Sequence, residues 1–254
     1  MVLRRERCLL LCMAYPDYSD TYGATVCMAG ITESGDLRRI YPVPFDKFKQ
    51  IDFAKRRWIE YDVIEKGDYR KESYKIDPDS VEVGDKIPYR EVGRRVDDRV
   101  TTIEELNRRQ EDDDTSLGFI RPELDDLRIQ EDEERAQRAK QYDEQRTLTG
   151  DSMPVEVIPH YLRYQFSCGE GCDTDHEIMC EDIEMGMLYR NLTDRYDSLD
   201  VVEQKLKEKF VDWMVEERDL YFMVGTHFSW GSWLIVSVLY PERVDSERLD
   251  RWMN

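Results

Sequence analysis

Short apolar runs alternate with turn signals over the first 86 residues, a pattern typical of a small β-rich unit. The runs contain β-branched and aromatic residues and are separated by Pro-Asp, Glu-Ser-Gly-Asp and Lys-Gly-Asp turns. The predicted strands are Cys8–Ala14, Ala24–Ile31, Leu37–Tyr41 and Trp58–Glu65. Phe45, Phe48 and Ile51 recur at helical spacing and predict one short helix over residues 45–55. Several strands with a single helix favour a small barrel or a curled sheet.

The middle of the chain is more charged and less regular in its hydrophobic pattern. Thr102 and Glu105 form a capping box for a helix over Ile103–Gln110, with Thr101 as the alternative cap. Residues Glu131–Gln145 are almost entirely polar. They predict a solvent-exposed helix or a linker, and a helix that binds a partner is the alternative.

The last hundred residues mix helices with strongly apolar strands. A strand over Val155–Phe166 leads into a helix that is predicted to begin at Asp175 and end at Asn191. The reason is a second capping box, formed by Thr174 and Glu177. The remaining predicted elements are an amphipathic helix opened by Asp200 and two central strands, Leu220–Val224 and Trp233–Tyr240.

Three of the six cysteines and one of the three histidines gather in one short segment. Gly169 and Gly171 favour a tight loop, because glycine adopts backbone angles that other residues avoid. The predicted helix then places an imidazole and a thiolate one turn apart on one face. Loop and helix together could surround a tetrahedral zinc ion. The predicted metal ligands are Cys168, Cys172, His176 and Cys180.

Other interpretations of this segment stay open. Cys180 is the predicted ligand for which another residue could most readily substitute. Its possible substitutes are Asp173, Asp175, Cys8, Cys12 and Cys27. Free thiols beside a surface histidine would need no metal, and a disulfide is a further alternative. Reduced cysteines in a cytoplasmic protein favour metal over a disulfide.

These patterns predict an α+β protein, with a β-rich, barrel-like or curled N-terminal part and a C-terminal α+β part that holds a zinc knuckle. The predicted domains are residues 1–100, a charged helical connector over 101–150, and residues 151–254. No internal repeat is visible in the sequence. The first part resembles oligonucleotide-binding barrels in architecture alone.

Charge is distributed unevenly along the 254 residues, of which 40% are hydrophobic, enough for a core. The net charge of -19 arises in residues 101–254, because residues 1–100 hold 19 basic and 19 acidic residues. A polyanion contact is therefore easier to place on the first hundred residues. Lysine is scarce beside arginine, 11 against 26, and such an Asp-rich, Lys-poor, acidic surface resembles that of proteins from salt-accumulating archaea. An ordinary acidic cytosolic protein is the alternative.

The N-terminal apolar run after Arg7 is at the short limit for a signal peptide and is followed by Tyr15-Pro16-Asp17, a poor cleavage context. A first buried strand is the better interpretation. No run reaches the length of a membrane span, so we expect a soluble, cytoplasmic protein.

Basic residues and aromatics interleave in the first part of the chain. Arg38, Arg39 and Tyr41 share one predicted strand, and Arg57 opens the next. This combination suits neutralisation of a nucleic-acid backbone together with base stacking. The alternative is a charged sheet edge that resists aggregation.

A second binding candidate is the loop that holds His227 and Trp230, between the two last predicted strands. Aromatics beside a histidine could hold a base or another planar ligand, and loops on rigid strands often carry binding residues. The histidine could also complete a catalytic zinc site, or the loop could simply cover the core.

The sequence carries none of the familiar catalytic motifs. His-Glu-x-x-His, Gly-x-Ser-x-Gly, the phosphate-binding Gly-x-x-x-x-Gly-Lys loop, the dinucleotide glycine fingerprint and the deaminase pattern are all missing. The prediction therefore favours a protein that is not an enzyme. The runner-up is a zinc-dependent hydrolase or nuclease, with Glu170, Asp182 or His227 acting beside the metal.

Several scattered blocks together resemble an uncharacterised group of prokaryotic and phage-type proteins. The blocks are Arg39–Phe45, Trp58–Asp62, Ser116–Pro122, the segment from Cys168 to Asn191, and Phe222–His227 with Trp233–Val236. The resemblance implies a standalone prokaryotic protein and no particular activity. We therefore expect a zinc-stabilised, non-enzymatic protein that binds nucleic acid or a nucleoprotein complex. A protein-interaction adaptor acting through the acidic helical region is a further alternative.

Overall fold

Strands from the first half of the chain close into a five-stranded barrel. The computed structural model of the protein describes residues 2–19, 21–149, 156–169, 172 and 174–243. The elements of this half are β1 (Arg4–Met13), β2 (Asp17–Ser19), β3 (Gly23–Thr32), β4 (Leu37–Pro44), α1 (Phe45–Gln50), β5 (Arg57–Lys66), β6 (Ser73–Ile76), a 3₁₀ turn (Pro78–Ser80), β7 (Glu82–Lys86), α2 (Arg90–Val96) and a second 3₁₀ turn (Asp97–Arg99). Neighbours around the barrel follow the order β1-β3-β4-β6-β5, and β5 pairs with β1 to close the ring. The seam between β4 and β6 is parallel, and the other four seams are antiparallel.

The apolar character of β1 follows from burial of both of its faces. Cys8 and Leu10 point into the barrel interior, and Leu9 and Leu11 pack with residues of the second half of the chain. Because successive side chains of a strand point to opposite faces, a strand covered on both sides becomes a continuous apolar run.

Strands of the second half repeat the strand order of the first barrel. The elements are α3 (Ile103–Asp113), β8 (Leu117–Ile120), β9 (Glu123–Glu131), α4 (Glu133–Thr149), β10 (His160–Ser167), β11 (His176–Met179), α5 (Ile183–Thr193), α6 (Leu199–Lys207), a π-helical turn (Glu208–Trp213), α7 (Met214–Glu217), β12 (Tyr221–Thr226) and β13 (Trp233–Leu239). Two three-stranded sheets, β11-β10-β9 and β13-β12-β8, meet where β8 runs on into β9. They meet again at a parallel bridge between Cys180 and Ile235. If β8 and β9 are counted as one bent strand, each barrel has five strands. When these are numbered along the chain, the strands of both barrels are neighbours in the order first, second, third, fifth, fourth.

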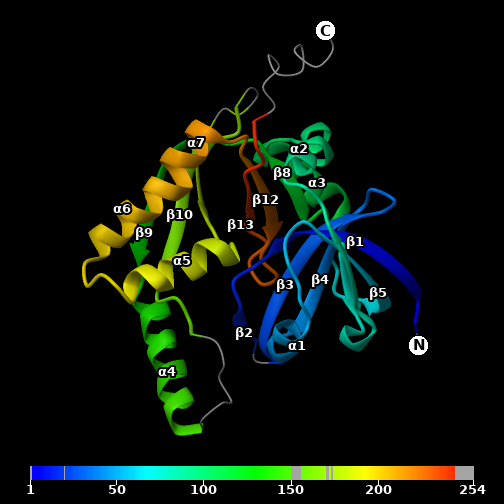
Figure 1. Ribbon diagram of the computed structural model, residues 1–254, viewed down its shortest axis with the longest axis horizontal. Helices are drawn as coiled ribbons and strands as arrows, with labels where there is room; N and C mark the ends of the chain where they lie inside the picture. The colour runs from blue at the N-terminus through cyan, green and yellow to red at the C-terminus, as the bar shows by residue number, and fades with distance from the viewer. Residues whose placement is uncertain (1, 20, 150–155, 170–171, 173, 244–254) are drawn as a thin grey trace.

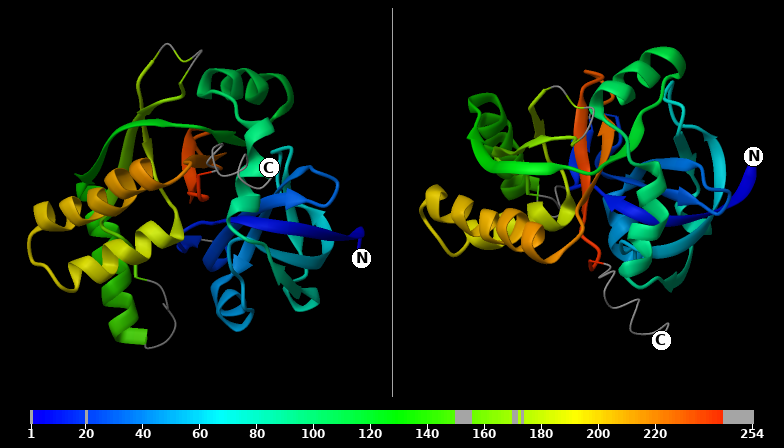
Figure 2. Two further views of the ribbon diagram at one scale, coloured as in Figure 1. Left: turned by 45° about the horizontal axis from the view of Figure 1, so that its top comes forward. Right: turned by 90° about the horizontal axis from the view of Figure 1, so that it is seen from above.

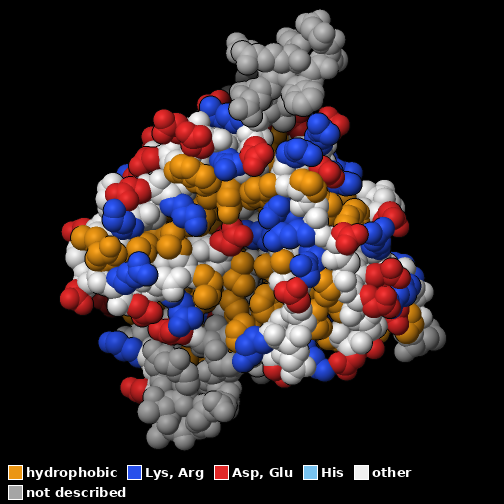
Figure 3. Space-filling view, viewed as in Figure 1, with side chains coloured by type: hydrophobic (Ala, Val, Ile, Leu, Met, Phe, Trp, Pro, Cys, Tyr) orange, Lys and Arg blue, Asp and Glu red, His pale blue; other side chains and the backbone are white. Residues whose placement is uncertain are grey.

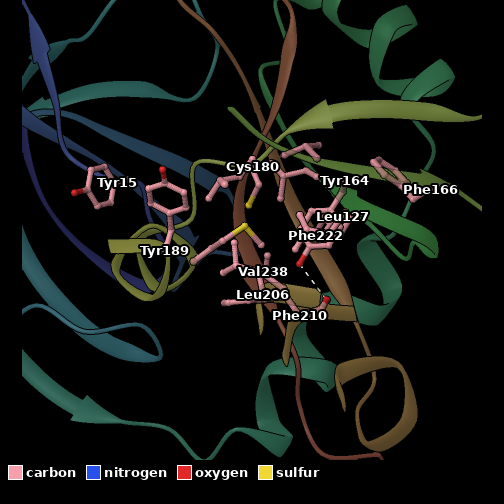
Figure 4. Packing of buried hydrophobic residues seen from close by; sticks show 14 of the residues in the cluster. Tyr15, Leu127, Tyr164, Phe166, Cys180, Tyr189, Leu206, Phe210, Phe222 and Val238 are labelled. Carbon is pink, nitrogen blue, oxygen red and sulfur yellow. Dashed lines mark hydrogen bonds between the residues drawn. The ribbon is translucent and has the colours of Figure 1, made fainter. Parts of the chain in front are cut away.

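Aromatic residues fill the second barrel, and helices α5 to α7 cover it (Figure 4). The rings of Tyr164 and Phe222 lie 4.8 Å apart, and Phe166 meets Phe222 edge-on at 5.2 Å. The Tyr164 hydroxyl donates a 3.1 Å hydrogen bond to the Phe210 carbonyl, which fixes the helical layer to the sheet. The polar end of a buried tyrosine is thereby satisfied, as a low-dielectric interior requires.

The two barrels lie side by side and share a third apolar core (Figure 1). The views in Figure 2 show the same separation, with helices α4, α6 and α7 on the side away from the first barrel. Leu9 and Leu11 of β1 contribute to the shared core, together with Phe119 of β8 and Met223 of β12. On the face shown in Figure 3, hydrophobic side chains gather across the middle with Lys and Arg among them, and both charges occupy the edges.

Buried polar contacts also join the two barrels. Lys55, just before β5, forms an ion pair with Asp182, which caps α5. Both side chains are at most 5% exposed. Glu72 accepts hydrogen bonds from the amide and the hydroxyl of Ser116, at 3.0 and 2.7 Å. Buried charges are tolerated when they are paired and hydrogen-bonded in this way.

The structure confirms the predicted α+β class and the barrel-like first part. The predicted helix from Asp175 to Asn191 is wrong: His176–Met179 is strand β11, and helix α5 begins only at Ile183. Backbone pairing with β10, in the register Phe166–His176, prevails over the local capping pattern. The segment 101–150 contains two helices and also strands β8 and β9, and the predicted domain boundaries stay a prediction. Among the described residues, no helix is both long and apolar enough to span a membrane.

Candidate metal centre

Four potential metal ligands meet at one end of the second barrel. Glu104 lies in the first turn of α3, Cys168 directly follows β10, Cys172 lies in the next loop, and His176 opens β11. One ligand atom from each residue lies within 4.8 Å of the others. This cluster, which we call the Cys-His-Glu cluster, could hold a metal ion.

The closest contacts of the cluster centre on His176. Its Nε2 atom lies 3.1 Å from the Cys172 sulfur and 3.4 Å from Oε1 of Glu104. The Cys172 sulfur lies 3.8 Å from the same carboxylate oxygen. The imidazole side chain is 11% exposed and packs against the Phe166 ring at 5.4 Å. His176 is thereby held with Nε2 turned toward the other donors.

The local backbone brings the two cysteines to the same place. Gly169 has a φ of +75°, in the left-handed region that favours glycine, and the Cys172 amide donates to its carbonyl at 3.1 Å. This turn reverses the chain between β10 and β11. On the other side, the Thr174 hydroxyl donates a 3.0 Å hydrogen bond to Glu104, which ties the loop to α3.

The protonation states of the cluster would allow a metal cation to bind in place of a proton. Burial raises the pKa of the Cys168 thiol to about 12, so this sulfur keeps its proton unless a metal takes its place. Burial also acts to raise the pKa of Glu104, but hydrogen bonds from its own amide, Thr174 and Thr102 outweigh it and lower the pKa. The other carboxylate oxygen of Glu104 is buried and has no hydrogen-bond partner among the described residues. Such an oxygen is available to a metal.

The structure brings together three of the four predicted ligands and leaves Cys180 out. Cys180 is buried in the apolar core of the second barrel, and its backbone forms the bridge to Ile235. Because His176 begins a strand, a residue four positions later lies about 13 Å farther along the chain. Glu104, which the sequence analysis did not select, occupies the fourth position. Its sequence signal is weak, since it is one of several acidic residues in the first turn of a predicted helix.

Arg38 and Arg39 are buried, and their guanidinium groups donate hydrogen bonds to other groups of the protein. Arg38 donates two hydrogen bonds to Glu6, at 2.7 and 3.0 Å. Arg39 points the other way and donates to the Ser116 carbonyl at 2.7 Å. They are 7% and 3% exposed, so neither placement supports the predicted contact with nucleic acid. The second barrel covers the outer face of β4, which sequence alternation could not indicate.

The other predicted binding residues lie nearer the surface. Arg57 is half-buried and forms a 2.5 Å ion pair with Asp52, and Tyr41 meets Tyr22 edge-on at 6.5 Å. The structure does not bring them to the Cys-His-Glu cluster.

His227 and Trp230 lie together in the loop between β12 and β13. Their rings stack at 4.0 Å and 18°. The loop is therefore a separate feature from the metal cluster. Two residues considered for zinc catalysis also have other roles, because Asp182 pairs with Lys55 and His227 stacks on Trp230. Glu170, Gly171 and Asp173 lie outside the described residues.

The architecture defines a two-barrel α+β protein with a candidate metal centre in its second barrel. The chain belongs to the family described as Domain of unknown function (DUF8757), whose model matches residues 99–253. A second model, Domain of unknown function (DUF8758), matches residues 4–105. These matches confirm the expected uncharacterised group, and its prokaryotic or phage origin stays a prediction.

Comparison with individual proteins adds one structural likeness. No curated protein matches the chain. A solved structure, "Crystal structure of the tetrameric p202 HIN2", is similar with a TM-score of 0.35 and 9% identity, over 96% of this chain and 94% of that chain.

Proposed function

We propose that this chain is a non-enzymatic, zinc-stabilised protein that binds nucleic acid. The observation that carries the zinc part is the Cys-His-Glu cluster, which offers two sulfurs, one imidazole and one carboxylate. Thiolate and imidazole donors favour zinc over hard cations such as magnesium or calcium. Zinc bonds of ordinary length place tetrahedral ligands about 3.3 to 3.8 Å from one another. Contacts of 3.1, 3.4 and 3.8 Å need only small movements to reach that arrangement.

A structural role for the metal is supported by the origin of the ligands. Glu104 comes from α3, Cys168 and Cys172 flank the turn after β10, and His176 comes from β11. An ion held by all four would join α3 to the paired strands β10 and β11. Four protein ligands also fill a tetrahedral zinc and leave no position for a reacting water.

Nucleic acid as the ligand is supported by the strand order of the barrels. A five-stranded barrel in which the third and fifth strands pair in parallel, between antiparallel seams, has the topology of oligonucleotide- and oligosaccharide-binding barrels. This support is an analogy at the level of the fold, and the contact residues must be argued separately. Because Arg38 and Arg39 are buried, we propose a contact surface that does not include them.

Metal analysis of protein purified without added metal tests the zinc proposal. One zinc per chain is expected, with loss of the metal in Cys172→Ala and His176→Ala. Cys27→Ala is the matched control, because Cys27 is a half-buried cysteine outside the cluster. Retention of labelled single-stranded DNA or RNA across a salt series tests the binding proposal. Purified protein without zinc, or without retention of either nucleic acid, would refute the corresponding part.

Hydrolysis at the same metal is the second candidate, and the exposure of Glu104 favours it. The Glu104 side chain is 41% exposed, against 11% for His176, so water could replace this carboxylate. A zinc with three protein ligands and one water can generate a nucleophile. Under this alternative, Glu104→Ala keeps zinc and releases phosphate or ester products faster than the wild-type protein. Under the structural proposal, Glu104→Ala weakens zinc retention and yields no turnover.

A further inference from the structure

Three exposed aromatic rings lie on two loops that Arg70 connects. Trp230 is 69% exposed, Phe228 57% and Tyr69 54%, the three highest values among the large hydrophobic side chains that the structure describes. Trp230 and Phe228 lie between β12 and β13, and Tyr69 lies between β5 and β6. These loops are equivalent, because each connects the fourth and fifth strands of its barrel. We call the three rings the aromatic surface.

Contacts with neighbouring rings fix the positions of the exposed aromatic side chains. His227 stacks on one face of the Trp230 indole at 4.0 Å and leaves the other face available. The Phe228 and Tyr69 rings lie 6.2 Å apart at 41°. A single exposed tryptophan needs no explanation. Three exposed rings on connected loops of the two barrels suggest a recognition surface.

Hydrogen bonds fix both loops beneath the rings. Gly231 donates to the His227 carbonyl at 2.9 Å, and Gln110 of α3 donates to the Gly231 carbonyl at 2.9 Å. Arg70, next to Tyr69, donates to the Thr226 carbonyl at 2.8 Å and so connects the loop of the first barrel to that of the second. Its guanidinium also lies 5.7 Å from the Phe228 ring. The aromatic surface is therefore preorganised, which lowers the entropy lost when a ligand binds.

The cation beside the rings is already paired. Arg70, whose guanidinium lies against the Phe228 ring, forms a 2.6 Å ion pair with Asp68. We therefore expect a contact at the aromatic surface to depend on the flat faces of the rings rather than on local charge.

We propose that the aromatic surface binds unpaired bases of single-stranded nucleic acid by stacking. Every base presents a flat face to an aromatic ring, whereas a duplex hides those faces within its own stack. This inference rests on the proposed nucleic-acid function and adds its contact site. It also moves that site from the buried arginines of β4 to the loops between the fourth and fifth strands.

Fluorescence anisotropy with a labelled oligo-dT strand and a labelled duplex of the same length tests this site. Trp230→Ala, Phe228→Ala and Tyr69→Ala should each weaken binding of the single strand about tenfold, the usual size of one stacking contact. Trp230→Phe should keep most of the affinity, because it keeps a ring. Tyr196→Ala is the matched control, since Tyr196 is 38% exposed and lies outside both loops. The wild-type protein should prefer the single strand over the duplex.

The possible failures are distinguishable. If the wild-type protein binds the strand and a variant that carries all three alanine substitutions binds it equally well, the aromatic surface is not the contact site and the nucleic-acid function stands. If the wild-type protein binds neither strand nor duplex, the proposed function fails and this inference fails with it. Self-association that the same variants abolish, without oligonucleotide binding, would make the surface a protein interface and overturn the inference.

Discussion

The two barrels share one strand order but close in different ways. In the first barrel, the third and fifth strands, β4 and β6, pair at Arg39–Ser73 and Ile40–Tyr74. In the second barrel, the corresponding seam between β11 and β13 is the single bridge from Cys180 to Ile235. The first barrel has one six-residue helix between its third and fourth strands, whereas the second has α5, α6 and α7 there.

Side-chain hydrogen bonds support the shorter seam of the second barrel. Asp182, two residues after the bridge, accepts from the Val238 amide at 2.8 Å and from the Glu184 amide at 2.7 Å. It therefore connects β13 to α5 while it also pairs with Lys55. A metal ion in the Cys-His-Glu cluster would hold α3 to the other end of the same sheet. We expect the second barrel to depend on these groups more than the first barrel depends on any single side chain.

The largest effect is expected from Lys55→Ala. This change leaves the Asp182 carboxylate buried without its cation, and breaking a buried pair in this way costs about 3 to 5 kcal/mol of unfolding free energy. Lys47→Ala is the control, because the Lys47–Asp79 pair has side chains 35% and 74% exposed and should contribute about 0 to 1 kcal/mol. Urea denaturation measures both. Equal small losses would show that the buried pair does not join the barrels.

Metal removal should come next and should affect the second barrel alone. A chelator, or Cys172→Ala, should lower the unfolding free energy by about 3 to 4 kcal/mol, the linkage expected for a ligand at 100 to 1,000 times its Kd. Hydrogen exchange should speed up at the start of α3 and along β10 and β11, and stay unchanged in β1 and β5. Cys27→Ala should leave both barrels protected. Faster exchange spread evenly over both barrels would contradict the comparison.

A smaller effect is expected where α5 packs against the first half of the chain. A Cβ added at Gly186 would lie 2.2 Å from Cδ2 of Tyr15, whose ring is buried. Gly186→Ala should therefore cost about 1 to 3 kcal/mol through overpacking. At Gly93 in α2, the added Cβ would meet Pro241 at an ordinary 3.4 Å. Gly93→Ala should be neutral or stabilise by up to about 1 kcal/mol, because alanine favours helix. The midpoint of thermal unfolding should fall in Gly186→Ala and stay unchanged or rise in Gly93→Ala.

The smallest effect concerns pH and the loop that carries Tyr69. Burial acts to raise the pKa of Asp68, but its hydrogen bonds with Arg70 and Ser73 outweigh burial and lower it. A depressed pKa in the folded state stabilises the protein above the unfolded pKa, about 3.9, and this contribution is lost as the pH falls. Urea midpoints of the wild-type protein should therefore fall more steeply than those of Asp68→Asn between about pH 5 and pH 3. Parallel curves would show that Asp68 does not support this loop.

Much of the fold could be predicted because continuous apolar runs indicate strands that are buried on both faces. The runs predicted as strands at Cys8–Ala14 and Trp233–Tyr240 match β1 and β13 closely, since both faces of these strands are covered. The repeated strand order could not be predicted. The two barrels agree in topology without a visible sequence repeat, and topology depends on pairings between distant segments.

The site was only partly predictable, for similar reasons. Cys172 and His176 were found because they lie four residues apart, whereas Glu104 lies more than sixty residues earlier. The Thr174–Glu177 pattern favoured a helix locally, and pairing with β10 overrode it. The burial of Arg39 depends on Ser116 of the other barrel, which no pattern within β4 reveals.

X-ray absorption at the zinc edge tests the central claim most directly, because it counts the atoms around the metal. We expect one zinc per chain with two sulfur ligands at about 2.3 Å and two nitrogen or oxygen ligands at about 2.0 Å. A shell of three sulfurs and one nitrogen would restore Cys180 as a ligand in place of Glu104. Protein without zinc would contradict the metal centre itself.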